Sequence, residues 1–214
     1  MVDPIDANRG NWDERATTHA RDTTGDYMLD RFRAGEDALH AIEAAELGDI
    51  YGKRVLHLQC HIGRDTLCLV RRGAVATGLD FSGVALDVAR HLSSEPRLKA
   101  DFVQATVDEA PHLTPGPFDL VFTTWGTICW LPGMTVWARV IASVLVPRGE
   151  LYFADAHPSF LVLEEHVGRP IGARHAVTAE TNDRHTEISV GEPVAFHERS
   201  PCLKALREHI RAVP

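Results

Sequence analysis

The spacing of hydrophobic residues changes along the chain between two periods, which predicts alternating strands and helices. Short apolar runs bounded by polar or glycine positions predict five strands, at residues 54–60, 75–80, 101–105, 118–124 and 150–155. Between them, apolar residues recur at helical spacing over residues 65–72, 82–92 and 136–145. Strands that alternate with helices favour right-handed crossovers, so we expect a mostly parallel, doubly wound α/β sheet with helices on both faces.

The segments on either side of this core have weaker patterns. Residues 11–50 are expected to be helical, with a buried stripe formed by Leu39, Ile42 and Leu47. In the final segment we expect two short strands, 187–190 and 194–197, and a last helix from Leu203 to Ile210. The predicted regions are therefore an N-terminal helical cap at 1–50, an α/β core at 51–156 and a lid or acceptor region at 157–214.

Composition narrows the class of protein. The 214 residues carry 22 basic and 30 acidic side chains, a formal charge of −8, and 44% of them are hydrophobic. This balance argues against a nucleic-acid partner, which would require a basic surface. The sequence shows neither a secretory signal nor an apolar stretch long enough to cross a membrane. The four cysteines contain no C-x-x-C pair, so we expect a reduced, cytoplasmic protein.

The chemistry is expected where open parallel sheets bind ligands, beyond the carboxyl ends of their strands. That rule selects three loops, at residues 59–65, 80–82 and 124–131. Asp80 ends the second predicted strand, 17 positions after Gly63. A carboxylate at this place can accept hydrogen bonds from both hydroxyls of a ribose. The alternative is that Asp80 only caps the helix that follows.

Several ordered motifs resemble the class I S-adenosylmethionine-dependent methyltransferases. The two strongest are KRVLHLQCHIGRDTL at 53–67 and GAVATGLDFS at 73–82. They are most similar to a bacterial branch in which HLQCHxGxDT replaces the usual LDLGCGxGxD. Weaker similarities are WDERA at 12–16, FDLVF at 118–122, CWLP at 129–132 and LVPRGELYF at 145–153. Over residues 11–158, the resemblance implies a Rossmann-like methyltransferase fold and S-adenosyl-L-methionine as cofactor.

The chain departs from the superfamily pattern at the first loop. His57 stands in place of an acidic residue, and Gln59 and His61 stand in place of glycines, so only Gly63 is left to allow close backbone approach. We expect Gln59 and His61 to hydrogen-bond the methionine carboxylate or amine. Thr106 occupies a position where the superfamily often has an aspartate facing the adenine amine, which weakens side-chain recognition of adenine.

The resemblance also assigns the remaining cofactor contacts. Trp12 and Arg15 are expected to fold over the methionine end, with capping of the sheet as the alternative, and Phe81 to pack beside the adenine. The predicted cofactor-binding residues are Trp12, Arg15, Gln59, Cys60, His61, Gly63, Asp80, Phe81, Thr106 and Trp125.

The acceptor is expected at the carboxyl end of the fourth strand. Trp125 and Trp130 flank the loop there and can shape an acceptor pocket, with core packing as the alternative. His157 follows the fifth strand nearby and is the candidate general base for an O–H or N–H acceptor. No metal site is predicted: on an extended strand His57, Gln59 and His61 share one face, and Cys60 points the other way.

The sequence therefore predicts methyl transfer to an oxygen or nitrogen atom of a small molecule. A nicotinamide-dependent oxidoreductase is a second interpretation, but the dinucleotide-binding motif G-x-G-x-x-G is missing after the first strand. A methyltransferase-like protein that binds or regulates without turnover is a third. The usual hairpin of strands six and seven is not recognisable, so a disguised hairpin, a shortened chain or a covering partner, such as a homodimer, remain alternatives.

Overall fold

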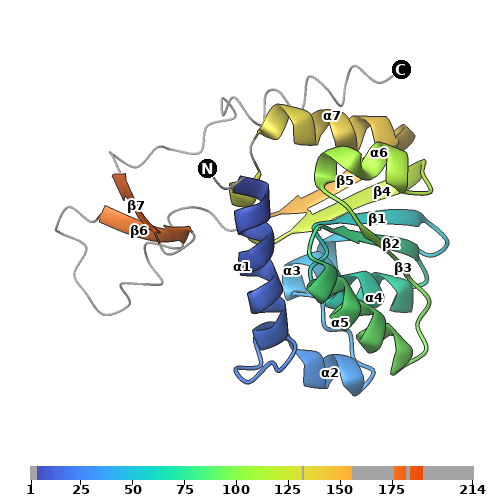
Figure 1. The fold of residues 1–214 in the computed structure, drawn as a ribbon. Helices are drawn as coiled ribbons and strands as arrows, with labels where there is room; N and C mark the ends of the chain where they lie inside the picture. The colour runs from blue at the N-terminus through green and yellow to red at the C-terminus, as the bar shows by residue number, and fades with distance from the viewer. Residues whose placement is uncertain (1–3, 132, 156–175, 182–183, 190–214) are drawn as a thin grey trace.

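A five-stranded parallel sheet forms the centre of the molecule (Figure 1). The computed structural model describes residues 4–131, 133–155, 176–181 and 184–189. The strands are β1 (Arg54–Leu58), β2 (Val75–Asp80), β3 (Asp101–Gln104), β4 (Phe118–Thr124) and β5 (Leu145–Ala154). They are arranged in the order β3-β2-β1-β4-β5, and each neighbouring pair is parallel. This order confirms the predicted doubly wound α/β fold.

Helices cover both faces of this sheet. The helices are α1 (Pro4–His19), α2 (Leu29–Arg33), α3 (Ala41–Glu46), α4 (Arg64–Arg71), α5 (Gly83–Ser94), α6 (Ala110–Leu113) and α7 (Met134–Val144). Two short 3-10 turns, η1 (Val107–Glu109) and η2 (Ile128–Trp130), follow β3 and β4. In Figure 1, α4 and α5 lie on one side of the sheet and α6 and α7 on the other, while α1 crosses the edge where the strands end.

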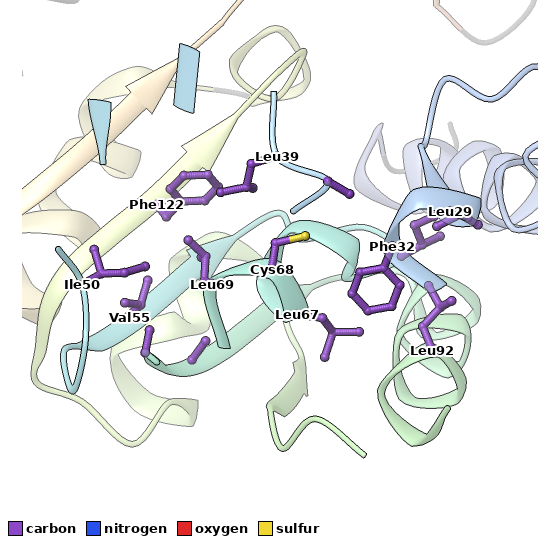
Figure 2. Packing of buried hydrophobic residues seen from close by; sticks show 14 of the residues in the cluster. Leu29, Phe32, Leu39, Ile50, Val55, Leu67, Cys68, Leu69, Leu92 and Phe122 are labelled. Atoms are coloured by element: carbon purple, nitrogen blue, oxygen red, sulfur yellow. The ribbon is translucent and has the colours of Figure 1, made fainter. Parts of the chain in front are cut away.

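The buried residues form two clusters, one on each face of the sheet. The first joins β1 and α4 to the N-terminal segment, and Figure 2 shows Phe32 and Leu29 of α2 together with Leu67 and Leu69 of α4. The second lies between the sheet and α7, and Trp137 is its largest fully buried side chain. Strand β1 contributes to both clusters, because its successive side chains point to opposite faces. Two buried faces explain why successive positions of this strand, Val55 and Leu56, are both hydrophobic.

Local sequence signals set most element boundaries. The expected spans of β2 and β4 agree with the structure at both ends. Ser82 caps α5 as predicted, since its side chain accepts a hydrogen bond of 3.0 Å from the Ala85 backbone N–H. One position predicted to be buried was wrong, because Ile42 is 54% exposed. It lies on helix α3, but the packing of that helix directs this side chain away from the core.

A second, two-stranded sheet lies apart from the first. Strands β6 (Ala176–Thr181) and β7 (Arg184–Ser189) pair with each other in antiparallel register. The predicted strand at 187–190 overlaps β7, whereas the one at 194–197 and the last helix lie outside the described residues. In the part of the chain that the structure describes, β5 is therefore an edge strand of the main sheet.

Candidate active site at the carboxyl edge of the sheet

The loop after β1 turns sharply as soon as the strand ends at Leu58. Gln59, His61 and Gly63 all have left-handed backbone conformations, with φ of 56°, 50° and 71°. The extended alternation expected for residues 57–61 was therefore wrong, because left-handed residues rotate each side chain out of the strand pattern. The side chains of His57, Gln59 and His61 therefore do not share one face, and each contacts a different part of the protein.

His57 and Gln59 connect β1 to two different neighbours. His57 Nδ1 lies 2.8 Å from Thr66 Oγ1 on α4, and burial lowers the pKa of His57 to about 3, which keeps the ring neutral. The first histidine and the threonine of the HLQCHxGxDT motif are thus hydrogen-bond partners. Gln59 Nε2 donates a hydrogen bond of 3.0 Å to the carbonyl of Thr127, which ties the first loop to the loop after β4.

Gly63 is required by packing inside the protein. A Cβ atom added there would lie 2.6 Å from Ala89 Cβ and 2.8 Å from Phe102 Cε1. Its backbone N–H donates to the carbonyl of Cys60 at 2.9 Å, so this N–H already has a protein acceptor. Close approach of α5 and β3 thus explains the glycine without any ligand contact.

Asp80 joins the first two loops of the site. One carboxylate oxygen accepts the backbone N–H of His61 at 2.8 Å, and the other accepts that of Ser82 at 2.9 Å. Burial raises the pKa of Asp80 to about 6, although these hydrogen bonds oppose the rise. The cap of α5 is Ser82 and not Asp80. The backbone N–H of Phe81 is a third donor to this carboxylate, which has about four acceptor sites, so one site is left to accept from a ligand hydroxyl.

Helix α1 covers the first loop with an aromatic cluster. The Trp12 ring lies edge-on to His61 and to Trp130, with centroids 5.1 and 5.4 Å away, and the Arg15 guanidinium lies 5.6 Å from the Trp12 centroid. Asp13, beside Trp12, accepts a hydrogen bond from the Ser82 hydroxyl. Trp12 and Arg15 thus lie over the 59–63 loop, and their contact with the methionine end of the cofactor stays a prediction.

Two further side chains extend this cluster. His19 Nδ1 lies 2.9 Å from His61 Nε2 and 2.6 Å from the Tyr27 hydroxyl. Burial, helped by His19 and Arg15, lowers the pKa of His61 to about 3, and burial and Arg15 also lower the pKa of His19. Both imidazoles are therefore neutral at pH 7, and His19 Nδ1, which has either one lone pair or one proton, is shared between its two partners.

Trp125 turns toward a different part of the N-terminal segment. Its indole N–H donates to Glu43 Oε1 on α3, and its ring lies 5.1 Å from the His40 ring. Trp125 and Trp130, predicted to flank one pocket, thus contact α3 and α1 respectively. Burial and the Asp65 carboxyl raise the pKa of Glu43 to about 7.

The titration of Glu43 leads to a stability prediction. Because its folded pKa lies above its unfolded value of 4.5, Glu43 stabilises the fold most below pH 4.5, and this contribution is lost as the pH rises through about 7. We expect Glu43→Gln to reduce the fall in unfolding free energy between pH 5 and 8 by on the order of 1–3 kcal/mol. Urea unfolding at several pH values measures the free energy of unfolding of both proteins. The same dependence of this free energy on pH in the wild type and in Glu43→Gln would contradict the prediction.

The other predicted residues are less central. The Thr106 hydroxyl and backbone N–H both donate to Glu109, at 2.9 and 2.8 Å, so this side chain serves the η1 turn. Phe81 is half-buried, and its carbonyl accepts from Gln104 at 3.3 Å. Cys60 is buried, and burial raises the pKa of its thiol. His157 lies outside the described residues.

Sequence reasoning missed four residues of this site: Asp13, His19, Tyr27 and Glu43. Each comes from the N-terminal segment and meets loop residues far along the chain, so no local spacing indicates them. A buried acid at position 43 had one weak signal, since Glu three residues after His40 is a capping pattern. In the described residues, no group of three or more His, Cys, Asp or Glu side chains is arranged to hold a metal ion.

The strand order and the acid at the end of β2 are those of a Rossmann-like α/β domain that binds a ribose-containing cofactor. Within this core, residues 55–149 match the family described as "Methyltransferase domain". Curated relatives named ubiquinone biosynthesis O-methyltransferase, from Escherichia coli O139:H28 and Shigella boydii serotype 18, are 32% identical over 111 residues. That match covers 52% of this chain and 46% of each relative, so the chain spans about half the length of these relatives.

Solved structures support the same fold. A complex of DhpI with SAH matches with a TM-score of 0.54 and 20% identity, covering 86% of this chain and 78% of that one. An S-adenosylmethionine-dependent methyltransferase described as putative, from Methanococcus maripaludis, also has a TM-score of 0.54, with 15% identity over 67% of this chain and 64% of its own. Within the residues described, none of the helices is both long and apolar enough to span a membrane.

Proposed function

We propose that this chain transfers a methyl group from S-adenosyl-L-methionine to an oxygen or nitrogen atom of a small-molecule acceptor. The observation that carries the proposal is the position of Asp80, at the carboxyl end of β2 and bonded to the backbone of the 59–63 loop. The names of the curated relatives favour oxygen as the acceptor atom.

Buried polar atoms at the loops fit this cofactor. Gln59 Oε1 and Thr127 Oγ1 have no hydrogen-bond partner among the described residues, although Gln59 Nε2 and the Thr127 carbonyl bond to each other. An unpaired buried acceptor is costly, and a bound ammonium group would satisfy it. We assign Gln59 to the methionine amine and Asp80 to the ribose hydroxyls. Trp12 and His61 cover the methionine end, and Phe81 lies at the adenine.

The cofactor supplies a methyl group activated by its sulfonium charge. The protein's part is to align the acceptor atom with that group and to exclude water. In our proposal the rings of Trp125 and Trp130 border the acceptor, and His157 takes its proton. Neutral His19 and His61 add no positive charge beside the sulfonium.

A thermal-shift experiment tests the cofactor assignment. S-adenosylhomocysteine at about 100 times its dissociation constant should stabilise the chain by roughly 2.7 kcal/mol, and NADH should have no effect. Stabilisation by NADH and not by S-adenosylhomocysteine would favour a nicotinamide-dependent oxidoreductase. Stabilisation without methyl transfer to any member of a panel of phenols, catechols and amines would favour a binding role.

A further inference from the structure

Glu43 is a buried acid whose position the cofactor assignment leaves unexplained. It is 0% exposed on the six-residue helix α3. Its Oε2 accepts the backbone N–H of His40 at 3.0 Å, and its Oε1 accepts the indole N–H of Trp125, 82 positions away in the chain. Burying a carboxyl group is unfavourable unless its hydrogen bonds are made, and these two donors offset part of that cost for Glu43.

Trp125 is held at both ends. Its backbone has a left-handed φ of 53°, and its N–H donates to the Ala154 carbonyl on β5 at 2.9 Å. At the far end of the side chain, Glu43 accepts the indole N–H, and the His40 ring packs against the indole at 57°. The plane of the ring is therefore set jointly by β5 and by α3.

The charges around Glu43 come from several elements. Asp65 and Arg64 at the start of α4 both act on it, and these two form an ion pair with Nη2 and Oδ1 2.5 Å apart. His40 precedes it on the same helix, and burial and Arg64 lower the pKa of His40. On β5, Glu43 contributes to the raised pKa of Tyr152. Arg64 is paired to Asp65. The hydrogen bond that joins Glu43 to the loop after β4 is the one from the Trp125 indole.

We propose that Glu43 is a positioning residue that fixes the Trp125 ring at the acceptor side of the site. This inference rests on the proposed function, because it takes the carboxyl end of β4 as the place where the methyl group is transferred. Glu43 acts through Trp125 and does not itself touch the acceptor, since it is 0% exposed and its two oxygens face the N–H groups of His40 and Trp125. Loss of Glu43 would free the indole to rotate and would remove one side of the acceptor pocket.

The test uses the indole N–H signals of the full chain labelled with ¹⁵N. The protein has four tryptophans, and Trp125→Phe identifies the signal of interest by its loss. In the wild type we expect this signal to titrate with a midpoint of about pH 7, as Glu43 gains a proton. In Glu43→Gln the amide oxygen can still accept the N–H, so the signal should stay near its low-pH position and lose the titration. In Glu43→Leu the indole loses its acceptor and the signal should shift at every pH.

Glu46→Gln is the matched control. Glu46 lies on the same helix and accepts the Tyr152 hydroxyl at 3.0 Å, so its substitution should leave the Trp125 titration unchanged. An unchanged titration in Glu43→Gln, or an unshifted signal in Glu43→Leu, overturns the proposal. Since Glu43→Gln keeps the size and polarity of the side chain, it remains informative if Glu43→Leu does not fold.

Addition of S-adenosylhomocysteine separates this proposal from the proposed function. We expect it to shift the Trp125 signal in the wild type. Binding detected by calorimetry with no change in that signal would overturn the position of Trp125 and leave the cofactor assignment intact. Absence of binding by calorimetry would overturn the proposed function, whereas the pH titration would still report on the Glu43–Trp125 contact.

Discussion

Asp80→Ala is expected to weaken the binding of S-adenosylhomocysteine by roughly 100-fold or more, because hydrogen bonds to a charged carboxylate contribute about 1.5–3 kcal/mol each. The substitution removes the group assigned to the ribose. It also leaves the backbone N–H groups of His61 and Ser82 without their acceptor. Isothermal titration calorimetry measures the affinity, and binding within threefold of the wild type would exclude the ribose assignment.

Two variants control for indirect effects. Asp87→Ala removes an exposed acid on α5 that pairs with Arg90, and it should bind as the wild type does. Asp80→Asn keeps one oxygen that can accept a backbone N–H, so its fold should be less disturbed than that of the alanine variant. Because the pKa of Asp80 is about 6, wild-type affinity should fall as the pH drops below 6. Asp80→Asn should not show this dependence.

Gly63→Ala is expected to destabilise the chain by about 2–5 kcal/mol. A left-handed φ costs a residue with a Cβ about 1–2 kcal/mol, and overpacking in a filled interior costs about 1–3 kcal/mol more. Both apply here, since φ is 71° and the new atom would lie 2.6 Å from Ala89 Cβ. Urea unfolding, with a check that its slope is unchanged, measures the loss.

Gly126→Ala is the matched control for the backbone effect. Its φ is 73°, nearly the same, but a Cβ there would meet nothing within 4 Å. It should therefore lose only about 1–2 kcal/mol, the left-handed part of the effect. Equal losses in the two variants would show that α5 and β3 do not require the glycine at position 63.

The alternating core could be predicted from sequence because its signals are local. Short runs rich in apolar residues mark β2 and β4, and Ser82 marks the start of α5, where the hydroxyl satisfies a free backbone N–H. The predictions failed where burial depends on how a helix is turned against the sheet. Ile42 lies on a helix as expected, yet it is more than half exposed, while Glu43 beside it is fully buried.

In the candidate site, too, some residues could be predicted from local signals and others depend on tertiary packing. Asp80 was found from its place at the end of a strand, because parallel topology brings all such ends to one edge. The role of Gly63 was expected to be ligand approach, but the structure explains this residue by packing against α5 and β3. Extended geometry does not hold from Gln59 to Gly63, so the directions of the Gln59 and His61 side chains could not be predicted from alternation.

By itself, the sequence determined the order of strands and helices, the edge of the sheet at which we propose that the chemistry takes place, and the resemblance that names the cofactor. These depend on periodicity and on short motifs, which act over a few residues. Only the tertiary structure decided that α1 carries Trp12 and His19 onto His61, and that α3 carries Glu43 onto Trp125. Such contacts depend on where the N-terminal segment crosses the sheet, and the packing of the whole core sets that crossing.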